Sequence, residues 1–324
     1  MKKPENIAVI DLGTNTFHLL IGRAEPGGPV ITYKTQEPVK LGEDLTLSNR
    51  IIPAAFQRGI QCLKKFRETI DSFGVLRVKA TATSGVRSAL NGADFVAQAK
   101  AEADIHIEVI DGNTEATYIY EGVKWSGAIS ETTLIMDIGG GSTEFILCNP
   151  EKLLWKKSYD IGAARLMQRF FHSDPLSSND AEALHEHLMQ QIPELLAICA
   201  VHHPQVLVGS AGAFETFYEM SRGIPTTRLQ QGGASVPADE NHSRNTSTHH
   251  AAARPLDYLR YRQLAEKLIA ATHAERAAMK GLIPLRVDMI VMAAFLTNLI
   301  LDRLSIRKIT LSTYDLKMGV LKSL

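Results

Sequence analysis

Two segments of this chain follow the same residue pattern, and this repeat constrains the fold more than any other feature. The first segment is IAVIDLGTNTFHLLI (7–21), and the second is TLIMDIGGGSTEFIL (133–147). In each, an apolar strand ends in Asp-x-Gly, a few small or hydroxyl-bearing residues follow, and a second apolar strand begins. A pattern that recurs at matched positions indicates a duplicated structural unit. We therefore expect two copies of one βββαβα-like plan, with the two turns facing each other across a cleft.

The length and charge of the chain agree with this expectation. Its 324 residues suffice for two domains, each able to bury a core. The hydrophobic fraction of 45% and the charged fraction of 22% are ordinary for a soluble globular protein. Lys plus Arg and Asp plus Glu both number 35, which argues against a protein that binds a nucleic acid polymer or an anionic membrane through bulk charge. A local anion site built from backbone N–H groups is compatible with this balance.

Other features argue against a secreted or membrane protein. The three cysteines have no C-x-x-C spacing, so we expect neither a disulfide framework nor a zinc site. The apolar run from Ile7 to Ile10 is too short for a signal-peptide core. No stretch approaches the ~18 apolar residues that cross a bilayer. We therefore expect a cytoplasmic protein.

Alternating strand and helix signals predict an α/β protein with mixed sheets. In the first half, the expected strands are 7–10, 17–23, 30–36, 76–83 and 105–110, and the expected helices are 53–73, 92–103 and 114–123. In the second half, the expected strands are 133–138, 144–149, 152–161, 206–210 and 308–312. The helices expected there are 162–172, 178–200, 212–221, 256–272, 274–280, 287–304 and 315–322. Residues 223–256 are rich in Gly, Pro, Ser, Thr, Asn and His, which predicts a long flexible loop.

The two turns have the composition of an anion-binding site. Turns without bulky side chains let backbone N–H groups approach an anion closely. Additional side-chain donors come from Thr14, Asn15 and Thr16 in the first turn and from Ser142 and Thr143 in the second. An aspartate at the end of each preceding strand can hold a hard cation beside a bound phosphate. Either turn alone could be an ordinary hairpin turn, and the match between them favours phosphate binding.

At this point the chain resembles a known family. The paired turns resemble the phosphate loops of the actin-like, Hsp70 and sugar-kinase superfamily. Nine segments in order resemble the exopolyphosphatase/guanosine pentaphosphate phosphatase (Ppx/GppA) family: VIDLGTNTFHLLI, VKLGEDL, ATATSGVRSALN, EVIDGNTEATYIYEGV, MDIGGGSTEFIL, SYDIGAARL, VGSAGAF, GLIPLRVDMI and ITLSTYDLKMGVL. The resemblance implies two duplicated actin-like (ribonuclease H-like) domains, with mixed β-sheets flanked by helices and the active-site cleft between them. The expected domains are 1–124 and 125–324, with the last helix packing back on the first domain.

The resemblance also implies roles for individual residues. Glu115 matches the catalytic glutamate of the family, and Thr114 stands where family members often carry a second acid. The residues implied to bind phosphate are Gly13, Thr14, Asn15, Thr16, Arg87, Gly139, Gly140, Gly141, Ser142 and Thr143. Asp137 and Glu144 resemble the family's acidic residues that are associated with magnesium or with the attacking water, and Asp11 is expected to bind magnesium with them.

Each of these assignments has a plainer alternative. Glu115 near the start of a helix could merely complement the helix dipole. Arg87 could be a surface ion-pair partner, and Glu144 on the returning strand could face solvent. We interpret His18 on its apolar strand as a packed, hydrogen-bonded histidine and not as a ligand. The turn at 209–212 matches the place where nucleotide binders of the superfamily contact adenosine, so a nucleotide could still be accommodated.

The leading hypothesis is a magnesium-dependent exopolyphosphatase that releases orthophosphate from inorganic polyphosphate, with Glu115 as general base. One alternative is hydrolysis of the 5′ γ-phosphate of guanosine pentaphosphate at the same site. Alternatives of other classes are an ATP-dependent kinase or ATPase and a non-catalytic polyphosphate or alarmone sensor. The resemblance further implies a homodimer. Longer family members carry a C-terminal His-Asp domain that has no counterpart here, so we expect a preference for short polyphosphate.

Overall fold

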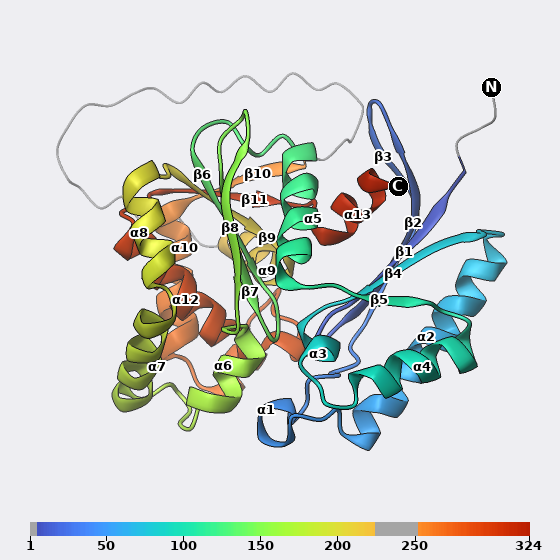
Figure 1. The fold of residues 1–324 in the computed structure, drawn as a ribbon. Coiled ribbons are helices and arrows are strands. Elements are labelled where there is room, and N and C mark those ends of the chain that lie inside the picture. The colour runs from blue at the N-terminus through green and yellow to red at the C-terminus, as the bar shows by residue number, and fades with distance from the viewer. Residues whose placement is uncertain (1–4, 224–251) are drawn as a thin grey trace.

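Two β-sheets that share the order of five strands form the frame of the protein (Figure 1). The computed structural model describes residues 5–223 and 252–324. The first sheet has the order β3-β2-β1-β4-β5, with β1 at Ile7–Leu12, β2 at Phe17–Glu25, β3 at Gly28–Glu37, β4 at Arg77–Ala82 and β5 at Ile107–Val109. The second has the order β10-β11-β9-β6-β7-β8, with β6 at Thr133–Ile138, β7 at Thr143–Cys148, β8 at Leu153–Tyr159, β9 at Val206–Ser210, β10 at Ala253–Leu256 and β11 at Lys308–Ser312.

The two sheets correspond strand by strand. In each, three antiparallel strands are followed by a parallel strand on the other side of the first strand, β4 beside β1 and β9 beside β6. The next parallel strands, β5 and β11, occupy equivalent outer positions, and β10 is added only to the second sheet. The duplicated α/β plan predicted from the repeat is therefore confirmed.

Helices cover both sheets. Those of the first half are α1 (Leu45–Ser48), α2 (Pro53–Ser72), α3 (Ser84–Arg87), α4 (Gly92–Ala103) and α5 (Gly112–Trp125). Those of the second half are α6 (Ala163–Phe170), α7 (Ser178–Gln191), α8 (Pro193–His202), α9 (Ala211–Ser221), α10 (Tyr258–Ala270), α11 (His273–Ala277), α12 (Met289–Arg303) and α13 (Leu316–Ser323), with a 3₁₀ turn at Pro284–Arg286. The apolar faces of α2 and α4 bury one face of the first sheet.

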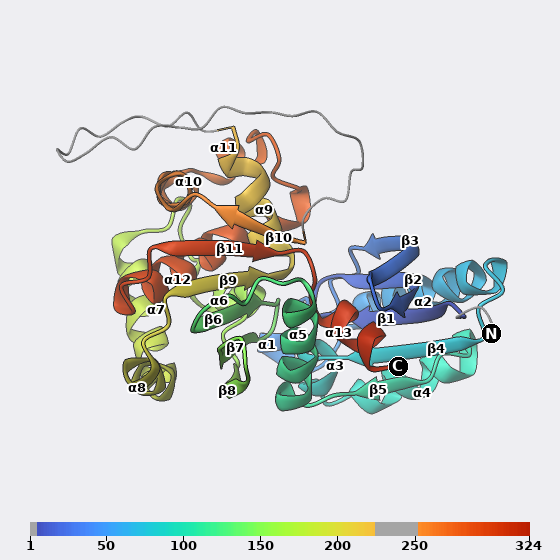
Figure 2. The same cartoon turned by 90° about the horizontal axis from the view of Figure 1, so that it is seen from above.

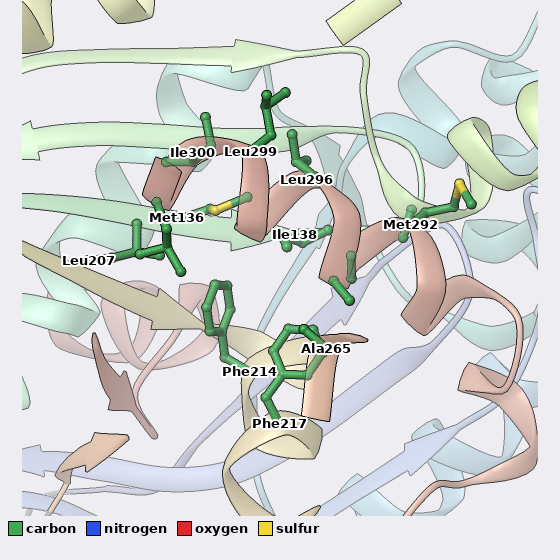
Figure 3. Packing of buried hydrophobic residues seen from close by; sticks show 14 of the residues in the cluster. Met136, Ile138, Leu207, Phe214, Phe217, Ala265, Met292, Leu296, Leu299 and Ile300 are labelled. Carbon is green, nitrogen blue, oxygen red and sulfur yellow. The ribbon is translucent and has the colours of Figure 1, made fainter. Parts of the chain in front are cut away.

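The largest core lies under the second sheet. Met136 on β6 and Leu207 on β9 meet Phe214 of α9 and the apolar face of α12, as Figure 3 shows. Helix α12 contributes Met292, Leu296 and other residues with no more than 8% exposure, so it is buried along most of its length. A helix apolar on nearly all sides is typical of a protein interior.

Helices α5 and α13 lie between the two sheets (Figure 2). They share one apolar cluster with the remaining faces of β1 and β6, so one core joins the two halves. The two helices cross at glycines: a Cβ at Gly122 would lie 2.2 Å from the carbonyl oxygen of Asp315, and one at Gly319 would lie even closer to that of Tyr118. Any larger residue would separate the helices.

Two predicted elements are wrong. The helix expected at 178–200 is two helices, α7 and α8, because Pro193 has no N–H and disfavours a helical Ile192 before it. The loop expected at 223–256 falls mostly outside the described residues, and its end, Ala253–Leu256, is the strand β10. Pro255 argues against a strand when the sequence is considered alone. A proline is tolerated here because β10 is an edge strand. Within the described residues, no helix is both long and apolar enough to cross a membrane.

Candidate active site

The two turns of the repeat have the same backbone geometry. The amide of Gly13 donates to the carbonyl of Thr16 at 3.1 Å, and the amide of Gly139 donates to that of Ser142 at 3.0 Å. Asp11 lies one position before the end of β1, and Asp137 lies one position before the end of β6. The repeat in the sequence is therefore a repeat in structure, with one aspartate at the base of each turn.

The two turns also contact each other. A Cβ at Gly140 would lie 2.4 Å from Nδ2 of Asn15. A Cβ at Gly141 would lie 2.9 Å from Oγ1 of Thr14 and 2.5 Å from Oγ of Ser84. The glycines of the second turn are thus needed because side chains of the first half take the space beside them. The Ser84 hydroxyl is buried there and has no hydrogen-bond partner among the residues that the structure describes.

A cavity of about 520 Å³ opens between the two halves. Twelve of the predicted site residues line it: Asp11, Gly13, Thr14, Asn15, Thr16, Glu115, Asp137, Gly139, Gly140, Gly141, Ser142 and Glu144. Two do not. Thr143 is fully buried and donates its hydroxyl to the carbonyl of Ile161 at 2.9 Å, and Arg87 reaches the cavity through its contact with Glu115.

Glu115 lies in the first turn of α5, where the chain enters the helix through an N-cap. Asp111 caps the helix by accepting from the amide of Thr114 at 2.7 Å. The Glu115 side chain is buried, and its Oε2 lies 3.0 Å from Nη1 of Arg87. The same Nη1 donates to the carbonyl of Ile110 at 2.8 Å. Arg87 therefore holds one carboxylate oxygen of Glu115, and the other, which makes no hydrogen bond to any described residue, can bind a ligand in the cavity.

Burial dominates the acid–base properties of this site. It raises the pKa of Glu115 well above the ordinary value, the charge of Glu144 raises it further, and Arg87 opposes both effects. Burial also raises the pKa of Asp137 to about 8 and that of Asp11 to about 6. Glu144 is buried too, with a raised pKa, and its Oε1 accepts from Ser158 at 2.7 Å. The alternative of a solvent-facing Glu144 is excluded by its exposed fraction of 1%.

The acidic residues suit a hard cation. Asp137 and Glu144 are register partners on β6 and β7 and are buried. Among the described residues neither forms an ion pair, so a bound cation would offset the negative charge that these carboxyl groups carry once deprotonated. No three His, Cys, Asp or Glu side chains of the described part are grouped so as to hold a metal ion by themselves. This donor set fits magnesium, which commonly takes one or two carboxylates together with substrate phosphates.

Three residues of the cavity were missed or misjudged from the sequence. Arg286, in the turn before α12, donates to Oγ1 of Thr216 at 2.8 Å, and its guanidinium fills the space over Gly212. Lys317, on α13, lies beside Asp11. Both residues lie in segments that carried the family resemblance. A single basic residue within each of these segments was the sequence feature from which they could have been predicted to line the site. His18 lies half-buried on β2, as expected of a packed side chain, but it also lines the cavity. The expected hydrogen bond is wrong, since its imidazole makes none within the described part of the chain.

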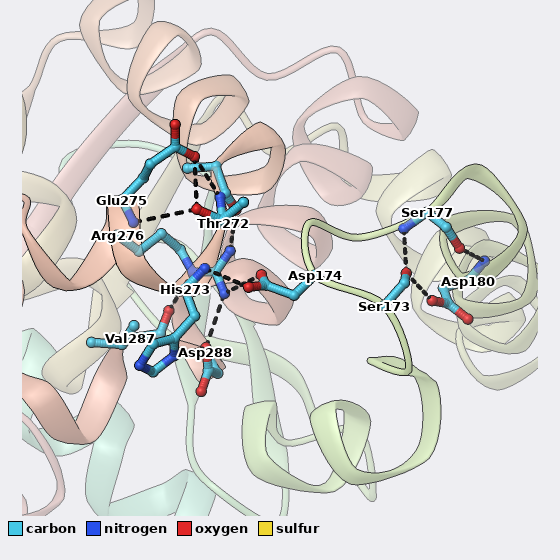
Figure 4. A network of polar contacts seen from close by, with 11 residues as sticks. Ser173, Asp174, Ser177, Asp180, Thr272, His273, Glu275, Arg276, Val287 and Asp288 are labelled. Carbon is cyan, nitrogen blue, oxygen red and sulfur yellow. Dashed lines mark hydrogen bonds and ion pairs between the residues drawn. The ribbon is translucent and has the colours of Figure 1, made fainter.

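A buried arginine holds the turn of the cavity lining that carries Arg286. Arg276 is fully buried, and its Nη2 lies 3.0 Å from Asp174 and 2.9 Å from Asp288 (Figure 4). Its Nε donates to the carbonyl of Val287 at 2.8 Å. These contacts tie the segment immediately after Arg286 to the body of the second half, so the guanidinium is presented from a rigid turn.

Comparisons with known proteins agree with this geometry. A family model described as the Ppx/GppA phosphatase family matches residues 20–324. A Haemophilus influenzae protein that carries a provisional exopolyphosphatase name is 28% identical over 98% of this chain and 91% of its own length. The crystal structure of an exopolyphosphatase from Cytophaga hutchinsonii is 35% identical, with a TM-score of 0.87 over 98% of this chain and 97% of that one. A Ppx/GppA family member from Aquifex aeolicus shares the fold at 24% identity, with a TM-score of 0.77 over 99% of this chain and 97% of that one.

Proposed function

This chain belongs to the Ppx/GppA phosphatase family, and from this premise we propose that it is an exopolyphosphatase that hydrolyses the terminal phosphoanhydride of inorganic polyphosphate. The observation that carries the proposal is a buried glutamate in a cavity lined by two matched phosphate-type turns. A hydrolase needs a group that activates water beside groups that neutralise phosphoryl oxygens, and this cavity contains both.

Glu115 is the proposed general base. Burial raises the pKa of the Glu115 carboxyl, which makes its deprotonated form a stronger base toward water. Arg87 holds one of its oxygens, so the other oxygen can accept a proton from a water molecule in the cavity. The alternative that Glu115 only complements the helix dipole does not explain its burial or its partner. Because Arg87 binds this glutamate directly, we propose that it positions Glu115 and contacts phosphate only from the edge of the site.

The two turns are the proposed binding site for the phosphoryl oxygens. Backbone amides of Gly140 and Gly141, and hydroxyls of Thr14, Ser84 and Ser142, line or adjoin the space between the turns. Preorganised donors of this kind stabilise charge that develops in a transition state. Arg286 adds a positive charge farther along the same cavity, where the next phosphates of a chain would lie.

Magnesium is the proposed cofactor. Asp137 and Glu144 would hold it. Asp11 lies beside Lys317, and its expected role as a third magnesium ligand stays a prediction. A bound magnesium ion would supply positive charge against the phosphoryl oxygens. The homodimer and the cytoplasmic location expected from the sequence stay predictions.

Guanosine pentaphosphate is the second candidate substrate. The cavity extends to Ala211, Gly212 and Ala213 at the start of α9, which leaves a place for a group beyond the phosphates. Arg286 lies directly on Gly212, so a nucleoside there would have to stack on or displace the guanidinium. We therefore rank linear polyphosphate first.

A substrate panel tests the proposal. Purified protein is mixed with tripolyphosphate, long polyphosphate, guanosine pentaphosphate or ATP, with and without magnesium, and released orthophosphate is measured. We expect release from polyphosphate and loss of turnover in Glu115→Gln. Glu121→Gln is the matched control, because Glu121 lies on the same helix and pairs with Lys322 at the surface. Binding without phosphate release would favour the sensor alternative, and release from ATP alone would favour an ATPase.

A further inference from the structure

The C-terminal helix contributes a cation to the cavity. Lys317, in the first turn of α13, lines the same space as the two turns. Its Nζ lies 2.5 Å from Oδ2 of Asp315 and 3.9 Å from Oδ2 of Asp11. Asp11 is the aspartate at the base of the first turn, more than 300 positions earlier in the chain. The end of the chain thus forms part of the proposed active site.

The Lys317 ammonium is held in place and stays charged. Asp315 is the N-cap of α13, and its Oδ1 accepts from the backbone amide of Lys317 at 3.1 Å. Its Oδ2 accepts from Nζ of the same lysine, so the Asp315 carboxylate holds both the backbone and the side chain of Lys317. The carboxylates of Asp315 and Asp11 lie on either side of the Lys317 ammonium, and both favour its charged form. The side chain is only 16% exposed.

This ammonium has hydrogen-bonding capacity left for a ligand. An ammonium carries three N–H donors, and within the described part of the chain Nζ donates to Asp315 alone. Asp11 attracts it by charge at a distance beyond a hydrogen bond. Lys322, one and a half turns farther along α13, offers the contrast: it pairs with Glu121 at the surface and does not line the cavity.

The helix that carries Lys317 cannot shift independently of the proposed base. Gly319 of α13 packs against the backbone of Tyr118, and Gly122 packs against the backbone of Asp315. Tyr118 and Gly122 belong to α5, which carries Glu115 in its first turn. Lys317 and Glu115 are therefore held in a fixed relation by two backbone contacts.

We propose that Lys317 is a substrate-binding residue whose ammonium contacts non-bridging oxygens of the phosphate chain beside the first turn. Its positive charge offsets the charge of Asp11 on that side of the cavity, while Asp137 and Glu144 are left for the cation on the other side. The inference rests on the proposed function, because it needs a phosphate chain in the cavity. It predicts that part of the binding of a phosphate chain does not need a divalent cation.

Calorimetric binding of tripolyphosphate in EDTA tests this proposal without turnover. We expect Lys317→Met to weaken binding at least 10-fold, Lys317→Arg to restore most of it, and Lys322→Met to leave it unchanged. Thermal unfolding of each variant identifies a folding defect, and Lys317→Gln takes the place of the Met variant if that variant does not fold. Unchanged tripolyphosphate affinity in a folded Met or Gln variant would overturn the proposal.

Separate outcomes distinguish this inference from the proposed function. If wild-type protein hydrolyses no polyphosphate and binds none, with or without magnesium, the proposed function fails. If wild type hydrolyses polyphosphate but binds tripolyphosphate only with magnesium present, the function stands and the role of Lys317 is wrong. In the supporting case, Lys317→Met also raises the KM for tripolyphosphate more than it lowers kcat.

Discussion

Nη1 of Arg87 lies 3.0 Å from Oε2 of Glu115, which joins the short helix α3 to the first turn of α5. The pair brings together two residues that the sequence singled out for different roles, one as a phosphate ligand and one as a base. Because the arginine stabilises the charged form of the glutamate, the contact keeps a buried carboxylate usable as a base.

Replacing Arg87 should therefore change the pH dependence of the reaction. In Arg87→Met, burial and the charge of Glu144 would act on Glu115 unopposed, so its pKa would rise further. A base must be deprotonated, so the acidic limb of kcat against pH should move to higher pH, and each pH unit of that movement would lower activity on the limb about tenfold. Arg67→Met, which removes a surface pair with Asp71 on α2, is the control. If the acidic limb does not move, Arg87 does not control the pKa of the catalytic base.

Asp137 should lower the stability of the metal-free protein at high pH. Its folded pKa of about 8 lies above the unfolded value of 3.8, so the stability present below pH 3.8 is lost as the pH rises toward 8. Asp137→Asn removes this loss and should raise the free energy of unfolding in EDTA at pH 8.5 by more than about 1 kcal/mol, since one pKa unit equals about 1.4 kcal/mol.

The increase in the free energy of unfolding caused by Asp137→Asn should become smaller toward pH 4. The variant should also lose hydrolytic activity. Denaturant unfolding at pH 5 and pH 8.5 checks the first point. Asp160→Asn is the control, because the side chain of Asp160 is 72% exposed. An equal increase in the free energy of unfolding at both pH values would show that the raised pKa of Asp137 is not its cause.

Gly141 should not tolerate a side chain. In Gly141→Ala the new Cβ would lie 2.5 Å from Ser84 and 2.9 Å from Thr14, so the two turns would have to move apart. We expect kcat/KM to fall about 100-fold or more, as displacement of positioned groups by about 1 Å often does. In the control Gly27→Ala, the added Cβ meets nothing within 4 Å, and steady-state kinetics should match wild type.

Arg286 should bind substrate without taking part in the bond-breaking step. Arg286→Ala should raise the KM for polyphosphate about 10-fold and change kcat little, because the guanidinium lies over Gly212, in the part of the cavity assigned to the phosphates beyond the terminal one. Arg222→Ala is the control, since Arg222 is exposed on the surface next to Glu219. A fall in kcat with an unchanged KM would place Arg286 at the reacting phosphate instead.

A substitution of Arg276 tests whether its contacts keep the turn that carries Arg286 in place. Asp174 and Asp288 are more than a third exposed and stay solvated without Arg276. The buried carbonyl of Val287 would lose its donor, at a cost of about 1–3 kcal/mol. Arg276→Met should lower the free energy of unfolding by that order. If the variant still folds, combining it with Arg286→Ala should raise the KM no further than Arg286→Ala alone. Additive effects would show that Arg276 does not act through Arg286.

Local patterns predicted most elements of this fold. The strand Thr133–Ile138 and the helix Gly92–Ala103 have the bounds expected from the sequence, because their signals are carried by neighbouring residues. The strand Ala253–Leu256 was missed because it exists only through its pairing with Lys308–Ser312, far later in the chain. The break at Pro193 had a local signal that the apolar periodicity across it obscured.

The sequence by itself determined the duplicated plan and the two turns, since an Asp-x-Gly step between apolar strands needs only near neighbours to form. Tertiary structure alone decided which charges meet in the cavity. Arg87 lies against Glu115, and Lys317 lies beside Asp11, because α5 and α13 pack into one apolar core between the sheets. That core forms by burial of side chains scattered along the whole chain, and no spacing within a single segment encodes it.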